Sequence, residues 1–260
     1  MNMPKVSVLM TMCNQAEFVN EAIQSILSQS FSDWELIITD DASDDDGVER
    51  VKKVVGDDPR VKIIRNNNRL GVSVNRNNAL KVMCGEYVAV LDADDMWVDC
   101  EKLSKQAKYL DIHKDCVLVS GNAQYIDARG ASLGQTRFPE FNNDIRRVIL
   151  SKNIITHSSA MYRREIANQV GNYANFRVGE DYELWLRLGQ KGKFYIFPEI
   201  LVKYRRSRGQ ATRGRIFEIL KTNYFLVGKY SKYYPNAFIA WCRRGLRCLL
   251  YYPVAKLFSK

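Results

Sequence analysis

The sequence has no long apolar run, no closely spaced cysteine pair and only two histidines. A membrane-spanning helix needs roughly 18 consecutive apolar residues, and no segment reaches that length. None of the six cysteines falls in a C-x-x-C pair, so we expect reduced thiols in a cytoplasmic protein instead of a disulfide framework. Residues 1–5 lead directly into a strand-like run, and we therefore expect no signal peptide.

Positive charge is abundant, and it is concentrated at one end of the chain. The net charge is +10, whereas residues 203–260 alone carry 14 Lys/Arg against one acid, Glu218, which leaves −3 for the remainder. A basic, aromatic-rich end is typical of proteins that meet an anionic surface such as phospholipid or nucleic acid. Nucleic acid is the weaker partner, because the sequence carries no nucleic-acid-binding signature.

The first half of the chain alternates strand and helix patterns. Nearly continuous apolar runs indicate strands covered on both faces, and apolar residues at helical spacing indicate the segments between them as helices. The expected strands are 6–12, 34–39, 61–64, 87–91 and 116–119, and the expected helices are 17–28, 48–55, 71–83 and 103–112. This alternation predicts an α/β sheet of the doubly wound type, which binds ligands beyond the carboxyl ends of its strands.

The second half is less regular and predicts a mixed sheet that completes the same domain. The expected elements are strands at 123–127, 159–162, 194–197 and 200–204, and a helix at 180–188. From about residue 214 the pattern becomes helical, with a second helical segment after Pro235. We therefore predict an α/β domain over residues 1–213 and a basic, aromatic helical tail over residues 214–260.

Two carboxylates separated by one residue, Asp92 and Asp94, follow the strand expected at 87–91. Residues i and i+2 of an extended segment point to the same side, so both side chains can reach one ligand. Carboxylate oxygens, completed by diphosphate and water, suit Mg²⁺ or Mn²⁺. The alternative is a pair of solvated turn residues.

Other polar turns strengthen the case for a nucleotide site. Asp40-Asp41 ends an earlier strand, where a carboxylate can accept a hydrogen bond from a base or a ribose hydroxyl; the alternative is an Asx turn before a cap at Ser43. Gly71 permits a close backbone approach, and Arg76 on the following helix can meet phosphate or base. The alternative there is a helix-starting turn with a solvated arginine.

The pair Glu180-Asp181 opens an amphipathic helix. Transfer to a hydroxyl group needs a general base within reach of that hydroxyl. A carboxylate in a partly buried crevice near other carboxylates has a raised pKa and suits this role. The alternative is an acidic first helical turn that the helix dipole favours.

Taken together and in order, these segments resemble the family 2 glycosyltransferases, which have the GT-A fold, a Rossmann-like mixed sheet flanked by helices. The similar stretches are residues 6–14, 21–31, 35–43, 91–95 and 179–187, which match the opening strand, first helix, acidic turn, metal motif and base motif of that family. The resemblance extends from about residue 4 to residue 206.

The resemblance implies a role for individual residues. Thr11 and Asp41 would hold the nucleotide base, with Asn14 and Glu17 nearby. Arg76 would contact the base or the phosphates, and Asp92 the ribose or the metal. Asp94 would coordinate Mn²⁺ or Mg²⁺ directly. Asp181 would be the catalytic base that takes the proton from the acceptor.

The sequence also departs from the family pattern. Met12-Cys13 stands where the family often has a small residue and Tyr. The family often has a His after its Tyr-Arg pair, but none follows Tyr204-Arg205, and Arg206 or Arg208 is a candidate to meet the diphosphate instead. His157 is an isolated histidine and is interpreted as structural.

The expected function is therefore inverting transfer of a hexosyl or N-acetylhexosaminyl group from a nucleotide-sugar, with UDP the first expectation and GDP and dTDP open. The acceptor would be a saccharide or a lipid-linked saccharide in bacterial cell-surface polysaccharide or glycolipid synthesis. The alternative is a non-catalytic nucleotide-sugar or carbohydrate binding module of the same fold. For the tail, we expect peripheral attachment to the anionic inner face of the cell membrane; packing on the domain or on a second subunit is the alternative.

Overall fold

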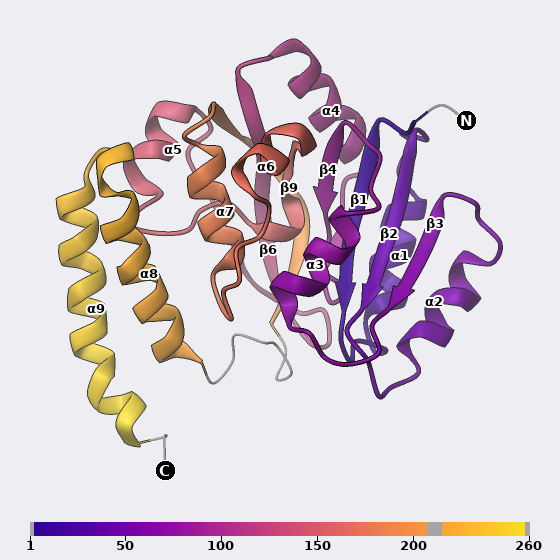
Figure 1. Cartoon of the computed structure of the whole chain (residues 1–260), viewed down its shortest axis with the longest axis horizontal. Helices are drawn as coiled ribbons and strands as arrows, with labels where there is room; N and C mark the ends of the chain where they lie inside the picture. The colour runs from indigo at the N-terminus through magenta and orange to yellow at the C-terminus, as the bar shows by residue number, and fades with distance from the viewer. Residues whose placement is uncertain (1–2, 207–214, 258–260) are drawn as a thin grey trace.

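The computed structural model of the chain describes residues 3–206 and 215–257, and within them a mixed sheet is flanked by helices (Figure 1). The strands follow the order β3-β2-β1-β4-β8-β6-β9-β5, with β7 paired to β6. They are β1 (Val6–Met12), β2 (Trp34–Asp40), β3 (Val61–Arg65), β4 (Tyr87–Val90), β5 (Met96–Trp97), β6 (Cys116–Asp127), β7 (Ser132–Gln135), β8 (Met161–Arg163) and β9 (Lys193–Arg206). The mixed α/β architecture expected from the sequence is confirmed.

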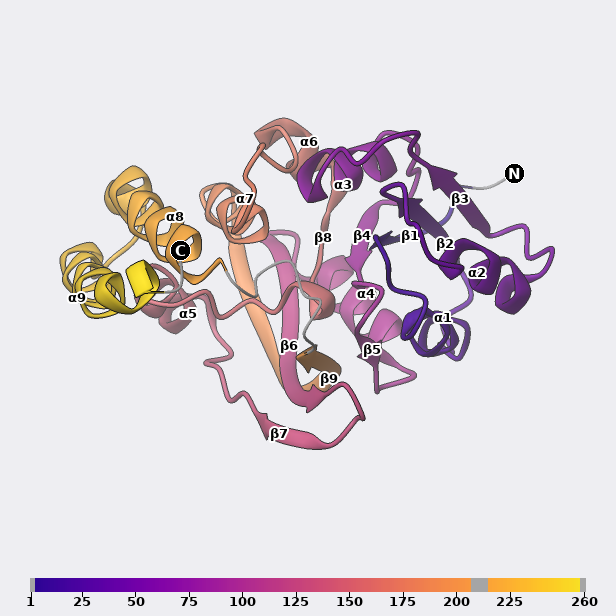
Figure 2. The same ribbon diagram turned by 90° about the horizontal axis from the view of Figure 1, so that it is seen from below.

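Strands β3, β2, β1 and β4 are parallel, as the continuous apolar runs predicted. Alternate residues of β1 enter two separate cores, because successive side chains of a strand point to opposite faces. Leu9 belongs to the core under α3 and α7, whereas Val8 and Met10 belong to the core under α1, α2 and α4. Figure 2 shows these two groups of helices on opposite sides of the sheet.

The helices are α1 (Val19–Leu27), α2 (Gly47–Val55), α3 (Val72–Leu80), α4 (Lys102–Ile112), α5 (Asn142–Val148), α6 (Arg164–Val170), α7 (Glu180–Leu188), α8 (Ile216–Tyr230) and α9 (Ala237–Leu257), together with the short 3-10 turns η1 (His157–Ser159) and η2 (Ser231–Tyr233). The expected helices in the first half all form, with ends that differ by up to three residues. The short elements β5, β7, α5 and α6 were not predicted, because two to seven residues carry too little periodicity to distinguish them from loops.

Two pairs of strands that the sequence analysis separated are each one long strand. The segments expected at 116–119 and 123–127 form β6, and those expected at 194–197 and 200–204 form β9. The two strands pair in parallel, and the register shifts where Phe197 pairs with Gly121 and Ile200 with Asn122. Pro198 lies in this irregularity, where its missing N–H costs no ladder hydrogen bond.

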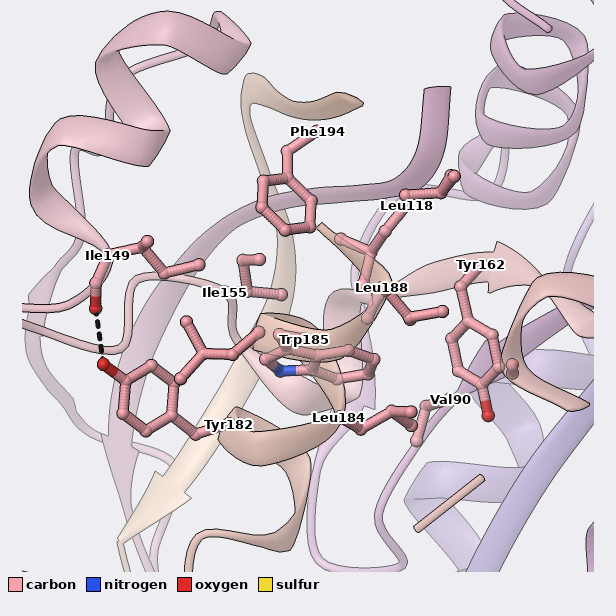
Figure 3. Close-up of a cluster of buried hydrophobic side chains, with 14 of the residues drawn as sticks. Val90, Leu118, Ile149, Ile155, Tyr162, Tyr182, Leu184, Trp185, Leu188 and Phe194 are labelled. Carbon is pink, nitrogen blue, oxygen red and sulfur yellow. Dashed lines mark hydrogen bonds between the residues drawn. The ribbon is translucent and has the colours of Figure 1, made fainter. Parts of the chain in front are cut away.

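Helix α7 carries the Glu180-Asp181 pair at its first turn and is fixed by its buried face (Figure 3). Trp185 lies at the centre of that face, beside the Tyr162 ring at 5.7 Å between centroids. The Tyr182 hydroxyl donates to the carbonyl oxygen of Ile149 at 2.7 Å. Because both side chains are completely buried, the start of α7 is held in one place against the sheet.

The C-terminal helices α8 and α9 pack beside α7 at the edge of the molecule opposite β3, as Figures 1 and 2 both show. Leu226, Val227 and Tyr230 of α8 and Ala240 of α9 belong to the same buried cluster as Trp185. The boundary expected at residue 214 falls in the undescribed segment 207–214. Within the described residues, no helix is long and apolar enough to cross a membrane.

A pair of glycine substitutions tests this packing. A methyl group at Gly85 would lie 2.4 Å from the backbone nitrogen of Ser7, so Gly85→Ala must displace β1 from the start of β4 and should lower the free energy of unfolding by about 2 kcal/mol. Gly228 in α8 has open space, and Gly228→Ala should raise it by up to about 1 kcal/mol. Urea unfolding measures both; the same sign for the two variants would contradict the packing described.

Candidate active site

The candidate site lies where the carboxyl ends of three neighbouring strands meet. Strand β1 pairs in parallel with β2 on one side and β4 on the other, so the turns after Met12, Asp40 and Val90 share one edge of the sheet. The backbone N–H of Asp41 donates to the carbonyl oxygen of Met12 at 2.9 Å, which joins two of these turns directly. The site residues expected in these three turns therefore lie at neighbouring positions along one edge of the sheet.

Asp41 is buried and organises the loop that leads into α3. Its carboxylate accepts the backbone N–H groups of Leu70 at 2.8 Å and Gly71 at 2.9 Å. The Asn66 side-chain amide donates to it at 3.0 Å. The neighbouring Asp40 accepts the N–H of Ser43 at 3.1 Å, which is the Asx turn that the sequence left open as the alternative for this pair.

Thr11, Asn14 and Glu17 lie around the end of β1 and the start of α1. Thr11 is half-buried beside Thr39 of β2, and Glu17 is exposed. Asn14 has a backbone φ of 56° and accepts the N–H of Asp44 at 2.8 Å with its side-chain oxygen. Asn14 thereby joins the end of β1 to the turn after β2.

Arg76 on α3 joins the turn after β4 to the start of α7. Its Nη2 donates to Asp92 Oδ1 at 2.9 Å, and its Nη1 contacts the Glu180 carboxylate. The Arg76 side chain is only 7% exposed. Burial lowers the pKa of Arg76, but the two carboxylates outweigh it and raise that pKa above its usual value, so the guanidinium stays charged.

Asp92 has a second partner in His157, which the sequence analysis interpreted as structural. His157 Nδ1 lies 3.0 Å from Asp92 Oδ2, and its Nε2 lies 3.0 Å from the Tyr173 hydroxyl. Burial opposes ionisation of Asp92, yet His157 and Arg76 hold the pKa of its carboxyl well below the usual value. Asp92 is therefore an ionised carboxylate held between two cationic or donor side chains, and His157 belongs to the site network.

Arg205, at the end of β9, holds the Asp92-Ala93-Asp94 turn from the other side. Its Nε donates to the carbonyl oxygen of Asp94 at 2.9 Å, and its backbone N–H donates to Asp95 Oδ1 at 2.7 Å. Arg205 is buried and also contacts Glu21 of α1 at 2.5 Å. This residue was not singled out from the sequence, which pointed instead to Arg206 and Arg208. Arg206 is exposed over the Tyr125 ring at 3.9 Å, and Arg208 lies outside the described residues.

The turn after β4 gathers negative charge of the kind that binds a divalent cation. Burial raises the pKa of the Asp95 carboxyl, and the charges of Asp94 and Asp92 raise it further. Carboxylate oxygens are the ligands that Mg²⁺ and Mn²⁺ prefer. Within residues 3–206 and 215–257, no group of three or more His, Cys, Asp or Glu side chains is placed to enclose a metal. The two carboxylates of Asp92 and Asp94 fit a cation that takes its other ligands from diphosphate and water.

Asp181 lies in the first turn of α7, after Gly179, whose φ of 81° is in the left-handed region that favours glycine. The Asp181 side chain is half-buried, and the Asn153 amide donates to it at 3.4 Å. Asp181 is next to Glu180 and is among the charges that act on Arg76. Asp181 therefore follows directly on the carboxylate that Arg76 contacts, Glu180.

The negative charge of the site also affects Tyr204 of β9. Burial raises the pKa of its phenol, and four nearby carboxylates raise it further. They belong to Asp95, Asp92, Asp94 and Asp181. The turn after β4 and the start of α7 are joined by Arg76, although about 90 residues of chain separate them. Glu180, His157, Tyr173 and Arg205 complete this network, and only the position of Glu180 next to Asp181 could have indicated one of them from sequence.

Comparison with known proteins identifies the family. Residues 7–171 match the model of glycosyl transferase family 2. A putative glycosyltransferase of Bacillus subtilis, EpsE, is 31% identical over 229 residues, which cover 86% of this chain and 81% of the relative. The chain belongs to glycosyl transferase family 2 and is a glycosyltransferase.

Further relatives agree in sequence and fold. The Escherichia coli enzyme WfaP, a UDP-Glc:α-D-GlcNAc-diphosphoundecaprenol β-1,3-glucosyltransferase, is 29% identical over 99% of this chain and 96% of its own. The mannosyltransferase PcManGT of Pyrobaculum calidifontis, solved with GDP-Man and Mn²⁺, superposes with a TM-score of 0.71 at 19% identity and covers 98% of this chain and 72% of that one. Nothing in these comparisons favours the non-catalytic binding module.

Removing Arg76 should destabilise the fold, because it would leave the buried Glu180 and the half-buried Asp92 with no shared cation. We expect Arg76→Met to lower the free energy of unfolding by about 3 kcal/mol. Arg69→Met removes an arginine whose half-exposed side chain pairs with the exposed Asp44, and should change it by less than about 1 kcal/mol. Urea unfolding of both variants measures the difference, and equal losses would refute the central place of Arg76.

Proposed function

We propose that this glycosyltransferase inverts the anomeric configuration of the sugar it transfers and that its donor is a UDP-sugar. The observation that supports this proposal most strongly is the Arg76 bridge. It brings the turn with Asp92 and Asp94 to the helix that begins with Glu180 and Asp181. In this proposal the donor side and the acceptor side lie next to each other, as a single displacement at the sugar carbon requires.

In this proposal the donor lies along the carboxyl ends of β1, β2 and β4. The nucleoside is bordered by Thr11, Asn14 and Glu17, and Asp41 accepts a hydrogen bond from its base. Arg76 and Asp92 lie on the side of the ribose and phosphates. Support comes from position: Asp41 shapes the loop that begins α3, and Arg76 is one turn farther along the same helix.

Asp94 is the residue proposed to hold Mn²⁺ or Mg²⁺. A divalent cation at this position would neutralise the charge that grows on the departing diphosphate. The chain itself contributes the shape of the turn, because Arg205 fixes the backbone carbonyl of Asp94 and the side chain of Asp95. Asp94 therefore sits in a turn held in one conformation.

Asp181 is the proposed general base. It accepts the proton of the acceptor hydroxyl while the hydroxyl oxygen forms a bond to the anomeric carbon. The bond from that carbon to the diphosphate oxygen breaks, and the diphosphate departs with the electron pair. Because the attack comes from the face opposite the leaving group, the configuration inverts. The half-buried position of Asp181 beside other carboxylates favours this role.

The acceptor is proposed to be a saccharide or a lipid-linked saccharide, and the transferred group a hexose or N-acetylhexosamine. The Escherichia coli relative, which matches nearly the whole chain, is named for a diphosphoundecaprenol-linked acceptor. We therefore propose a role in bacterial cell-surface polysaccharide or glycolipid synthesis, at the cytoplasmic face of the cell membrane, with the tail as the attachment.

Two variants separate the proposed roles of the carboxylates. Asp181→Asn should lower the turnover number by about 10²- to 10⁴-fold and leave UDP affinity unchanged, since it removes only the proton acceptor. Asp94→Ala should lower turnover and also weaken Mn²⁺-dependent UDP binding. Asp57→Asn, at an exposed loop position, is the control. Transfer kinetics and calorimetric titration with UDP provide the two measurements, and full activity in either variant would remove that residue from the mechanism.

A panel of nucleotide-sugars tests the donor class and the metal together. Release of nucleoside diphosphate should be fastest with a UDP-sugar, require Mn²⁺ or Mg²⁺, and stop when EDTA is added. Faster release from GDP- or dTDP-sugars would overturn the UDP assignment, and release unaffected by EDTA would overturn the metal assignment.

A further inference from the structure

The outward face of α9 carries an unusual concentration of exposed apolar side chains. Phe238 is 76% exposed, Leu249 73%, Leu250 63%, Leu246 58% and Ile239 48%. A helix turns about 100° per residue, so these five positions fall within roughly 120° of its circumference. We call this set the α9 stripe. It runs for about 18 Å along the helix.

The opposite side of α9 is already occupied by the protein. Ala240 is fully buried, and the Arg244 Nε donates to the carbonyl oxygen of Leu150 at 3.3 Å. Cys248 Sγ donates to the carbonyl oxygen of Leu220 in α8 at 3.6 Å. These contacts lie about 180° from the centre of the stripe. Helix α9 is thus held by one side, and the exposed stripe lies on the other. The helix itself lies at the outer edge of the molecule in Figures 1 and 2.

Charge next to the stripe is of one sign. Arg243 and Arg247 are exposed and follow the edge of the stripe at Leu250. They are four residues apart, and like charges at that spacing destabilise a helix unless an anion pairs with them. Residues 219–260 contain eight Lys/Arg and no Asp or Glu, so the tail offers no carboxylate from its own sequence. An apolar face bordered by exposed cations is the pattern of helices that lie in the interface of an anionic bilayer.

From this geometry we infer that the α9 stripe is the membrane-docking surface of the protein and that its partner is an anionic phospholipid bilayer. The helix lies in the plane of the interface, with the stripe among the acyl chains and Arg243 and Arg247 at the phosphates. This inference rests on the proposed function, in which the tail attaches the enzyme to the membrane, and it names the surface and the lipid that make the attachment. A second copy docked symmetrically on the stripe is disfavoured, because it would bring two acid-free basic helices together.

Vesicle flotation of the full chain tests the surface. Wild type should float with phosphatidylcholine vesicles that contain 30 mol% phosphatidylglycerol and much less with phosphatidylcholine alone. Leu246→Gln/Leu249→Gln should reduce partitioning by about ten-fold, because glutamine keeps the helix propensity and removes the apolar surface. Arg243→Gln/Arg247→Gln should reduce it by about thirty-fold on the anionic vesicles. The matched control, Ile112→Gln/Leu133→Gln, removes two exposed apolar side chains elsewhere and should partition like wild type.

The outcomes separate this surface from the catalytic proposal. Asp181→Asn, which should lose transfer, should still float, and Leu246→Gln/Leu249→Gln should still release UDP from its donor without vesicles. The inference is wrong if wild type fails to float on anionic vesicles, or if the stripe variant floats as well as the control. It is also wrong if light scattering shows a wild-type dimer that the stripe variant converts to monomer, since the occupant would then be a second copy.

Discussion

The structure of the site depends on one buried arginine shared by two carboxylates. Arg76 cannot lose its charge in this setting, and both Asp92 and Glu180 need a cation close by to remain ionised away from water. The bridge therefore fixes three elements at once, namely α3, the turn after β4 and the start of α7. Because Asp94 and Asp181 are neighbours of the bridged carboxylates, their separation is set by the same contact. Catalysis by positioned groups requires this kind of fixed spacing.

A second layer of contacts supports the bridge. His157 contacts Asp92 and is itself held by the Tyr173 hydroxyl. Arg205, at the end of β9, binds the backbone of the same turn. The buried face of α7, centred on Trp185, keeps its first turn against the sheet. Each carboxylate of the site is thereby oriented by side chains that do not themselves need to meet the substrate.

The sequence predicted the parallel half of the fold well, because strands buried on both faces, such as β1 and β2, are continuous apolar runs that are visible in the local sequence. It also predicted which turns carry the carboxylates. It divided β6 and β9 incorrectly, since Gly121 and Pro198 look like ends of strands when only the local pattern is considered. It could not predict which distant side chains contact the carboxylates of the site. His157 and Arg205 reach the site through contacts 65 and 111 residues away in the chain, and a single sequence carries no signal for such pairs.

The tail has a structural role inside the enzyme as well as an outward face. Glu183 of α7 is buried two residues after Asp181, and its carboxylate accepts hydrogen bonds from Lys229 and Tyr230 of α8. The Tyr234 hydroxyl donates to the carbonyl oxygen of Leu186, also in α7. The helix that begins with Glu180 and Asp181 is therefore packed directly against the C-terminal helices. A displacement of α8 would therefore also move the first turn of α7, where Asp181 lies.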